Sequence, residues 1–181
     1  MIKTRKELKE YISKDRNNYP CLSTKLKTFY AFLCHDRDYF VFRYIKLLRL
    51  TEYYDYRRKK NKLFLPVYIL IKSKKNKLGQ RLHLDFGENA FDKGLYIAHA
   101  GIIVGSSKIG KNCKLHGQNC IGSNVELGDN CELWVGAKII GPCKLGNNVT
   151  VAAGAVVVDC FEEDGIVLAG VPAKIVKRVQ Y

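Results

Sequence analysis

Histidines are the side chains of this chain best suited to acid–base chemistry, and three of the four, His83, His99 and His116, recur at spacings of 16 and 17 residues. The ordinary pKa of imidazole lies near neutral pH, so a positioned histidine can take a proton from a hydroxyl and later return it to a leaving group. Such a general base typically accelerates a reaction by about 10²–10⁴-fold. His99 and His116 are therefore candidate catalytic residues; the alternative is that they are polar surface residues.

A six-residue repeat runs through the segment that carries these histidines. Cutting the chain every six residues from Phe91 gives FDKGLY, IAHAGI, IVGSSK, IGKNCK, LHGQNC, IGSNVE, LGDNCE, LWVGAK, IIGPCK, LGNNVT, VAAGAV and VVDCFE. Every hexad begins with an aliphatic residue or Phe, and the fifth residue is small in most of them. This period fits neither an α-helix nor a simple strand; it predicts a parallel β-helix in which each hexad is a short strand and a turn.

The repeat also predicts where the histidines lie. Three hexads close one triangular coil of 18 residues, and twelve hexads make four coils stacked at a spacing of about 4.8 Å. His99 is third in its hexad, and His116 is second in the hexad three further on. We therefore expect the two imidazoles on adjacent coils, at one edge of the prism and outside its apolar core.

A metal site is the competing interpretation of the three histidines. Stacked one per coil, His83 and His116 would lie about 9–10 Å apart, whereas a Zn–N bond is only about 2.1 Å long. One zinc ion cannot bridge that column within a subunit. We predict no metal ion, with a site completed across a subunit interface as the remaining possibility, and we expect His35 and His83 to be structural.

The seven cysteines indicate a reduced protein. There is no CxxC pair and no secretory segment after Met1, and Cys113, Cys131 and Cys143 all occupy the fifth, small position of a hexad. The longest apolar run, 63–71, has nine residues and contains a proline, well short of the roughly 20 needed to span a bilayer. We predict a cytoplasmic protein without a transmembrane helix.

Two motifs make the chain resemble the hexapeptide-repeat acyltransferases from about Gly94 to Arg178. The segment AAGAVVVDCFEEDGIVLAGVPAKIVKR resembles the acetyl-CoA end of that family, where a last coil GAGSVV precedes a loop and AGVPAK. The segment GLYIAHAGIIV resembles the catalytic-histidine coil of serine acetyltransferases and of the O-acetyltransferases of bacterial capsule and exopolysaccharide biosynthesis, to which the match is closer. The resemblance implies an all-β left-handed parallel β-helix with a basic N-terminal α-helical segment.

The resemblance further implies the roles of individual residues. His99 would be the general base, and His116 would line the same cleft. A carboxylate would orient the base: Asp85 is our choice over Glu88, although strict alignment with the serine acetyltransferases places Leu84 at that position.

The cofactor residues are also carried over from the resemblance. Acetyl-CoA would contact the set Ala137, Ala153, Val158, Lys174 and Lys177. Corner packing is the alternative role of the alanines. Gly136 and Gly154 would leave space along this wall, and Trp134, the only Trp, would pack on a neighbouring subunit or on the cofactor. Similar proteins are trimers with the active site between prisms, so we expect a homotrimer.

The positive charge is confined to the first part of the chain. Residues 1–80 contain 21 Lys and Arg against 7 Asp and Glu, whereas the rest contains 10 of each. We predict a basic helical region at 1–80, with helices in 4–14, 38–60 and 66–82, then a β-helix domain at 81–165 and a C-terminal loop and tail at 166–181 that complete the CoA site. The basic region is either a solvated face or a peripheral contact with an anionic membrane; nucleic-acid binding ranks last.

These features lead to one main prediction and two alternatives. The main prediction is an acetyl-CoA-dependent O-acetyltransferase that acts on a sugar hydroxyl of a surface polysaccharide or its precursor, free or lipid-linked. Serine O-acetylation is the first alternative. Against it, Ala98 replaces the family's Asp before the histidine, the glycine-rich loop with a second active-site histidine is missing after Gly122, and the helical region is short. A non-enzymatic β-helical scaffold is the second alternative.

Overall fold

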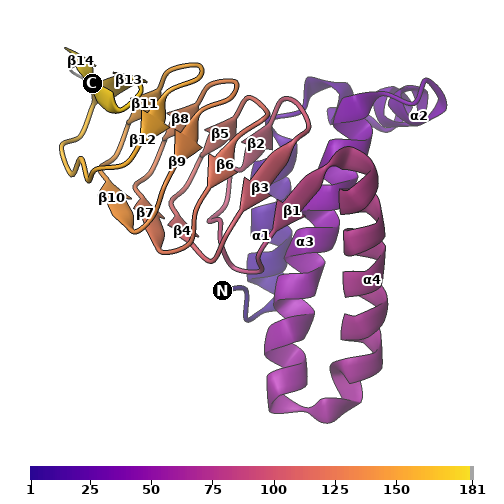
Figure 1. The fold of residues 1–181 in the computed structure, drawn as a ribbon. Coiled ribbons are helices and arrows are strands. Elements are labelled where there is room, and N and C mark those ends of the chain that lie inside the picture. Colours follow the sequence, from indigo (N-terminus) through magenta and orange to yellow (C-terminus); the bar gives the residue numbers. More distant parts are fainter. Residues whose placement is uncertain (180–181) are drawn as a thin grey trace. The chain divides into compact units, whose positions relative to one another are not determined.

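The computed structural model describes residues 1–179, and the chain divides into two compact units, Met1–Leu82 and His83–Tyr181. The first unit is helical, and Figure 1 shows its long helices α3 and α4 side by side. Each of the three predicted helical segments forms a helix, whereas α2 was not predicted. The elements are α1 (Arg5–Arg16), η1 (Pro20–Leu22), α2 (Lys25–Leu33), α3 (Arg37–Lys60), η2 (Lys62–Phe64) and α4 (Leu65–Leu82).

Capping and one buried ion network define the helical unit. Thr4 and Glu7 form a capping box that begins α1, and the Asp36 side chain caps α3. Arg49 on α3 is fully buried and donates to Asp15 of α1 at 2.8 Å and to Glu52 at 3.2 Å. A buried guanidinium is costly unless it is paired, so this network fixes α1 on α3.

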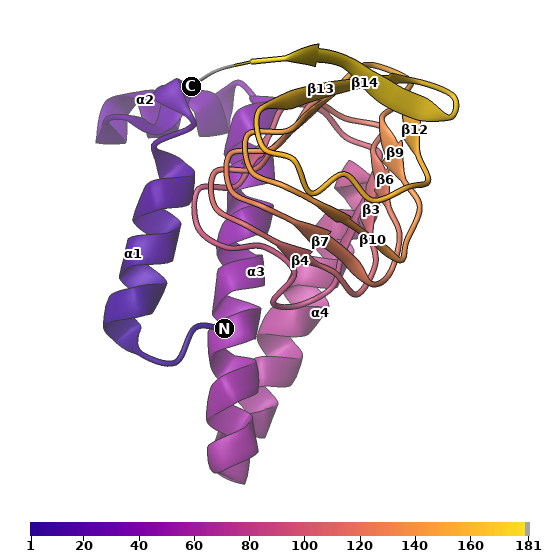
Figure 2. The same cartoon turned by 90° about the vertical axis from the view of Figure 1, so that its left-hand side faces the viewer.

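The second unit is a parallel β-solenoid with three faces, which confirms the predicted fold class (Figure 2). One face has the strand order β1-β3-β6-β9-β12, the second β10-β7-β4, and the third β14-β13-β11-β8-β5-β2. The strands are β1 (Leu84–Phe86), β2 (Tyr96–Ile97), β3 (Ile102–Val104), β4 (Lys108–Ile109), β5 (Lys114–Leu115), β6 (Cys120–Ile121), β7 (Val125–Leu127), β8 (Glu132–Leu133), β9 (Lys138–Ile139), β10 (Cys143–Leu145), β11 (Thr150–Val151), β12 (Val156–Val157), β13 (Ile166–Gly170) and β14 (Ala173–Arg178). Five strands on the first face require five coils, so the expected number of four is wrong.

The core consists of the inward residues of the hexads, with one exception. The first residue of each predicted hexad is buried except Ile103, which is 58% exposed. Ile103 pairs with Cys120 rather than with Ile121, so Ile102 and Val104 face the core instead. The turn between β2 and β3 is therefore one residue longer than the turn between β5 and β6, and the predicted register is wrong at this hexad.

The cysteines at the fifth position are part of the same core. Cys113, Cys131 and Cys143 are buried. Burial raises the pKa of the Cys113 thiol and raises the pKa of Cys131 and of Cys143 to about 11. These thiols are therefore packing groups that stay protonated at neutral pH.

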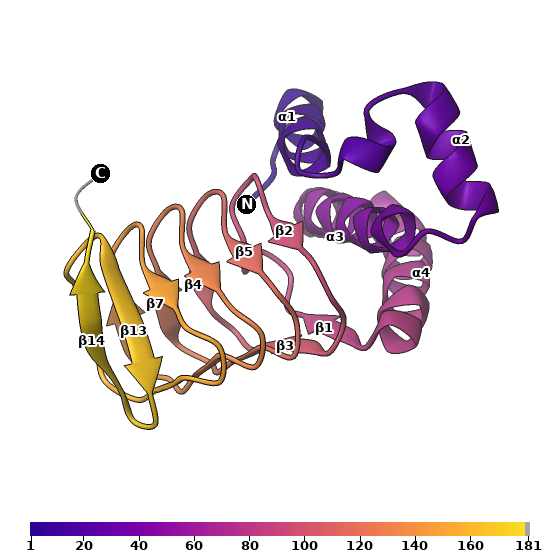
Figure 3. The same ribbon diagram turned by 90° about the horizontal axis from the view of Figure 1, so that it is seen from above.

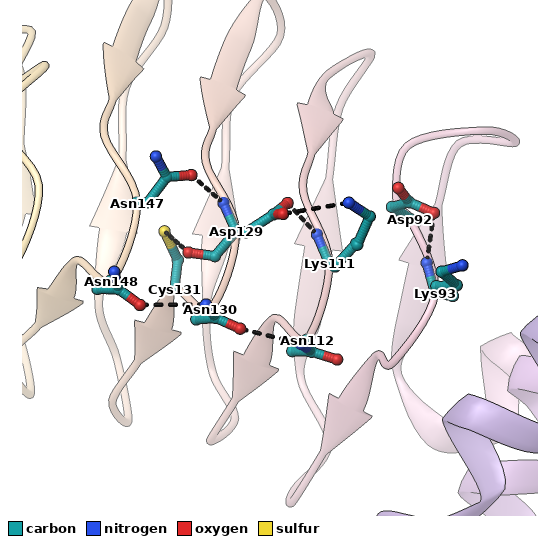
Figure 4. Close-up of polar contacts among 9 residues, drawn as sticks. All are labelled: Asp92, Lys93, Lys111, Asn112, Asp129, Asn130, Cys131, Asn147 and Asn148. Atoms are coloured by element: carbon teal, nitrogen blue, oxygen red, sulfur yellow. Dashed lines mark hydrogen bonds and ion pairs between the residues drawn. The ribbon is translucent and has the colours of Figure 1, made fainter. Parts of the chain in front are cut away.

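A ladder of asparagines closes the corner that leads into the third face (Figure 4). The Asn112 amide donates to Asn130 at 2.9 Å, and the Asn130 amide donates to Asn148 at 3.1 Å. All three have φ between 54° and 58°, the left-handed region that asparagine tolerates better than most residues. Beside the ladder, the Asp129 and Asn147 side chains each accept a backbone N–H of the preceding coil.

The C-terminal segment differs from the expected loop and tail. β13 extends the third face in parallel with β11, and β14 returns antiparallel to β13 (Figure 3). The pair covers the edge that β11 would otherwise expose. No helix in the described part of the chain is both long and apolar enough to cross a membrane.

Candidate functional site at one corner of the solenoid

His99 and His116 lie on adjacent coils at the corner between the third and first faces. His99 follows β2 and His116 follows β5, and these strands pair in register, with Ile97 opposite Leu115. This pairing sets His116 opposite Ala98 and His99 opposite Gly117. The structure thus brings the two predicted histidines to one corner, on neighbouring positions of successive coils.

The His99 side chain is exposed and lies against the next coil. A Cβ placed on Gly117 would come within 2.6 Å of the His99 Cβ, much closer than two carbons can pack. Gly117 also has φ of +111°, a backbone conformation that other residues adopt only with strain. A glycine at this position therefore provides the space that His99 occupies.

The His116 ring is held by two contacts. Its Nε2 lies 2.7 Å from Oε1 of Glu132, and its plane stacks on the Trp134 ring, with the centroids 4.4 Å apart and the planes 2° from parallel. Both partners come from β8 and the turn after it, one coil further on. A hydrogen bond and a stacked ring together restrict both the tilt and the rotation of the imidazole, so His116 is pre-positioned.

Asn119 braces the turn that carries His116. Its side-chain oxygen accepts from the Gly117 N–H at 2.9 Å, and its amide donates to the Trp134 carbonyl at 2.7 Å. The residue is 1% exposed. Because a buried amide is stable only when its groups are paired, Asn119 ties the turn of His116 to the turn of Trp134.

Asp85 does not occupy the position expected of a partner for His99. It lies in the middle of β1, exposed and opposite Ile103 on the first face, whereas His99 lies at the corner. Its side chain forms no hydrogen bond or ion pair with any described residue. The expected role of Asp85 is therefore corrected. Glu132 is a carboxylate at this corner, and it contacts His116. It was not predicted, although it pairs with Lys114, two residues before His116, on the next coil.

His83 is also displaced from the expected column. It precedes β1, and its carbonyl accepts from the N–H groups of Gly101 and Ile102. It therefore stacks below Gly101 rather than below His99. The set of metal-ligand side chains that does converge in the described part of the chain is Cys21, Asp36 and Asp38 of the helical unit, and it includes no histidine.

Small residues continue the histidine corner along the later coils. The column that contains His99 continues through Gly117, Val135 and Ala153. Val135 and Ala153 are exposed. Beside them, a Cβ on Gly154 would meet nothing within 4 Å. From His99 to Ala153 there are three coil spacings of about 4.8 Å, so the exposed wall extends about 14 Å from the imidazole.

The other predicted cofactor residues are more scattered. Ala137 is fully buried, and its N–H donates to the Trp134 carbonyl. Its side chain and amide are therefore not available to a ligand, which corrects the expectation that Ala137 contacts acetyl-CoA. Val158 is exposed but follows β12, at the corner on the other side of the first face. Lys174 and Lys177 are exposed on β14.

Comparisons with known proteins agree with this architecture. Residues 124–159 match the family model described as bacterial transferase hexapeptide (six repeats). No curated protein sequence matches the chain.

Solved structures of serine acetyltransferases have a similar fold. The enzyme of Neisseria gonorrhoeae has a TM-score of 0.74 at 20% identity, with 98% of this chain and 69% of that one covered. The soybean apoenzyme has a TM-score of 0.67 at 20% identity, with 94% and 69% covered. The Brucella abortus strain S19 enzyme in complex with coenzyme A has a TM-score of 0.66 at 21% identity, with 97% and 68% covered. The chain thus contains the bacterial transferase hexapeptide repeat at 124–159 and has the fold of the serine acetyltransferases.

Proposed function

We propose that the protein is an acyltransferase that moves an acetyl group from acetyl-CoA to a hydroxyl group. The observation that carries the proposal is the pair of histidines on adjacent coils at one exposed corner of a hexapeptide-repeat solenoid. The repeat match and the likeness to serine acetyltransferases, two of which were solved with coenzyme A, support the same class of reaction.

His99 acts as the general base in this proposal. Its imidazole takes the proton of the acceptor hydroxyl as that oxygen attacks the thioester carbonyl carbon. When the carbon–sulfur bond breaks, the imidazolium returns the proton to the CoA thiolate. His116, held by Glu132 and Trp134, positions the acceptor at the same corner.

The exposed wall beyond the histidines suits the pantetheine arm of acetyl-CoA. Its small residues, Ala153 and Gly154, let an extended chain approach the backbone closely. The exposed ammonium groups of Lys174 and Lys177 are suited to the CoA phosphates. Acetyl-CoA supplies the activated acyl group, and the residues named here bind it and direct the proton.

Two acceptors fit the proposal. L-Serine is supported by the structural comparisons, which include serine acetyltransferases solved with serine. A sugar hydroxyl is supported by departures from the serine enzymes, chiefly Ala98 in place of the Asp that precedes the histidine. We give serine priority because the comparisons favour it, and keep the sugar hydroxyl as the second candidate.

A test of the function incubates the protein with acetyl-CoA and either L-serine or a panel of sugars and follows the release of free thiol. We expect turnover with one acceptor class and a loss of about 10²–10⁴-fold in His99→Ala. His35→Asn, in the helical unit, is the matched control, because Asn tolerates the φ of 53° found there. Full activity of His99→Ala would contradict the proposed base. Absence of acetyl-CoA binding by calorimetry would instead favour the non-enzymatic scaffold.

A further inference from the structure

The helical unit contains a cavity of about 770 Å³ that the proposed acyl transfer does not use. Its lining combines apolar side chains of α3 and α4 with six cationic ones: Arg16, Arg43, Lys46, Lys74, Lys77 and Arg81. No aspartate or glutamate lines it. We call this site the cationic cavity, and its volume lies within the range of about 300–1,000 Å³ typical of small-molecule sites.

The charges around the cationic cavity are not balanced within the described part of the protein. None of the six cations forms an ion pair with a described carboxylate. Arg16 is instead held in place by the Leu22 carbonyl, to which its Nε donates at 3.0 Å. Six like charges around one cavity repel one another unless an anion neutralises them, and Arg and Lys are the side chains that bind phosphate best.

An exposed apolar helix lies next to the cationic cavity. On α2, Leu26, Phe29, Tyr30 and Leu33 are each more than half exposed. A second, smaller cavity lined by Phe29 and Phe32 shares Arg16, Thr28 and Tyr39 with the first. Lys25 also lines the smaller cavity, so a ligand that reaches from one cavity into the other would contact both cations and the aromatic side chains of α2.

We propose that the cationic cavity binds the phosphate-bearing headgroup of a lipid in an anionic bilayer, with the apolar side chains of α2 inserted among the acyl chains. A nucleic acid would satisfy the cations but not the exposed aliphatic side chains of α2. A second copy of the helical unit would bring two positive surfaces together, because residues 1–80 carry 21 basic and 7 acidic residues. A lipid phosphate satisfies both halves of the site.

The test is cosedimentation of the full chain with vesicles of phosphatidylcholine alone or mixed with phosphatidylglycerol. We expect binding to the mixed vesicles only. The variant Arg43→Gln/Lys46→Gln/Lys77→Gln removes three charges from the cavity; because each basic residue contributes about fivefold to partition at an anionic surface, binding should fall about 100-fold. Phe29→Ser, which keeps the charge, should also weaken binding.

The matched control is Lys6→Gln/Lys9→Gln/Lys14→Gln, which removes three exposed charges from α1 outside the cavity. It should bind almost as well as the parent protein, and circular dichroism should show unchanged helix content in all variants. Equal losses in the two triple variants would indicate diffuse attraction and overturn the cavity site. Two results together would overturn the lipid assignment in favour of a soluble phosphate. Inorganic pyrophosphate would bind saturably and displace the protein from vesicles, and Phe29→Ser would bind vesicles as well as the parent protein does.

Discussion

At the scale of single residues, the solenoid positions two imidazoles in different ways. His116 is held by contacts with Glu132 and Trp134 on the next coil. The space for His99 is instead provided by Gly117. His116 should respond to substitutions of Glu132 or Trp134, whereas His99 should respond to a larger residue at position 117. The two histidines can therefore be tested separately.

Replacing Glu132 tests whether His116 is a positioning residue. Glu132→Gln keeps a polar side chain but removes the charge that pairs with the imidazole, and we expect kcat to fall roughly tenfold, a coupling of about 1.4 kcal/mol. Steady-state kinetics of Glu132→Gln, His116→Ala and the double variant measure this. The double variant should be no worse than His116→Ala. Additive losses would mean that the two residues do not act as one unit.

Adding one methyl group at Gly117 tests the space left for His99. The new Cβ would lie 2.6 Å from the His99 Cβ and would keep the strained φ, so Gly117→Ala should displace His99 and cost about 1–3 kcal/mol of stability. Activity assays and thermal unfolding are the measurements. Gly165→Ala is the control, because Gly165 has a φ of 69° and lies away from the histidines. It introduces the same kind of backbone strain, so it should lose stability while keeping activity.

At the scale of elements, strands of only two or three residues need support at their turns. The corners supply it through residues stacked from coil to coil: Asn112, Asn130 and Asn148 form one column of amides, and Asp129 and Asn147 accept backbone N–H groups in another. Each rung joins two coils, so the turns stabilise the stack as the strands do.

Removing the central rung should destabilise the solenoid. Asn130→Ala loses both amide hydrogen bonds of the ladder. It also places alanine at a φ of 58°, a conformation that alanine tolerates less well than asparagine. We therefore expect the free energy of unfolding to fall by about 1–3 kcal/mol. Asn130→Gly keeps the backbone conformation and should lose less. Denaturant unfolding measures both. Equal stability of all three proteins would show that the ladder contributes nothing.

The buried thiols give an independent test of the core. Because burial raises the pKa of Cys131 and Cys143 to about 11, almost none of either is thiolate near neutral pH, and we expect a thiol reagent to label exposed Cys34 and Cys160 first. The contribution of these protonated thiols to the free energy of unfolding is fully present below their ordinary pKa of 9.0. It is lost as the pH rises toward 11. Mass spectrometry locates the label. Early labelling of Cys131 would contradict its burial.

At the scale of the whole molecule, the solenoid exposes apolar side chains at the corner that follows its first face. Ile140 and Val158 are 46% and 47% exposed and follow paired strands, so they form one apolar column. A contact between subunits would remove such apolar side chains from water. The homotrimer expected from the resemblance, in which an active site would lie between neighbouring solenoids, stays a prediction.

Native mass spectrometry tests the trimer. We expect a species of three chains, each of 20.6 kDa, and we expect Ile140→Asp to shift it to single chains because a carboxylate would be desolvated at the contact. Helix and strand content by circular dichroism should not change. A monomeric parent protein would remove the basis for a site shared between subunits.

The sequence alone determined the solenoid, because a six-residue period places the same kind of side chain inward at every strand and can be recognised without any contact being known. It also placed His99 and His116 on adjacent coils, and it located three of the four α-helices. The short α2 was not predicted, and Ala31 is its buried residue.

Only the tertiary structure decided the rest, because it depends on contacts between residues of different coils or helices. The extra residue in the turn after β2 exposes Ile103, a shift that a fixed period cannot show. Glu132 contacts His116, whereas Asp85 lies in the middle of β1 opposite Ile103, and only the pairing of the strands decides these placements. The six cations of the cationic cavity come from α1, α3 and α4, and only the packing of these helices brings their charges together.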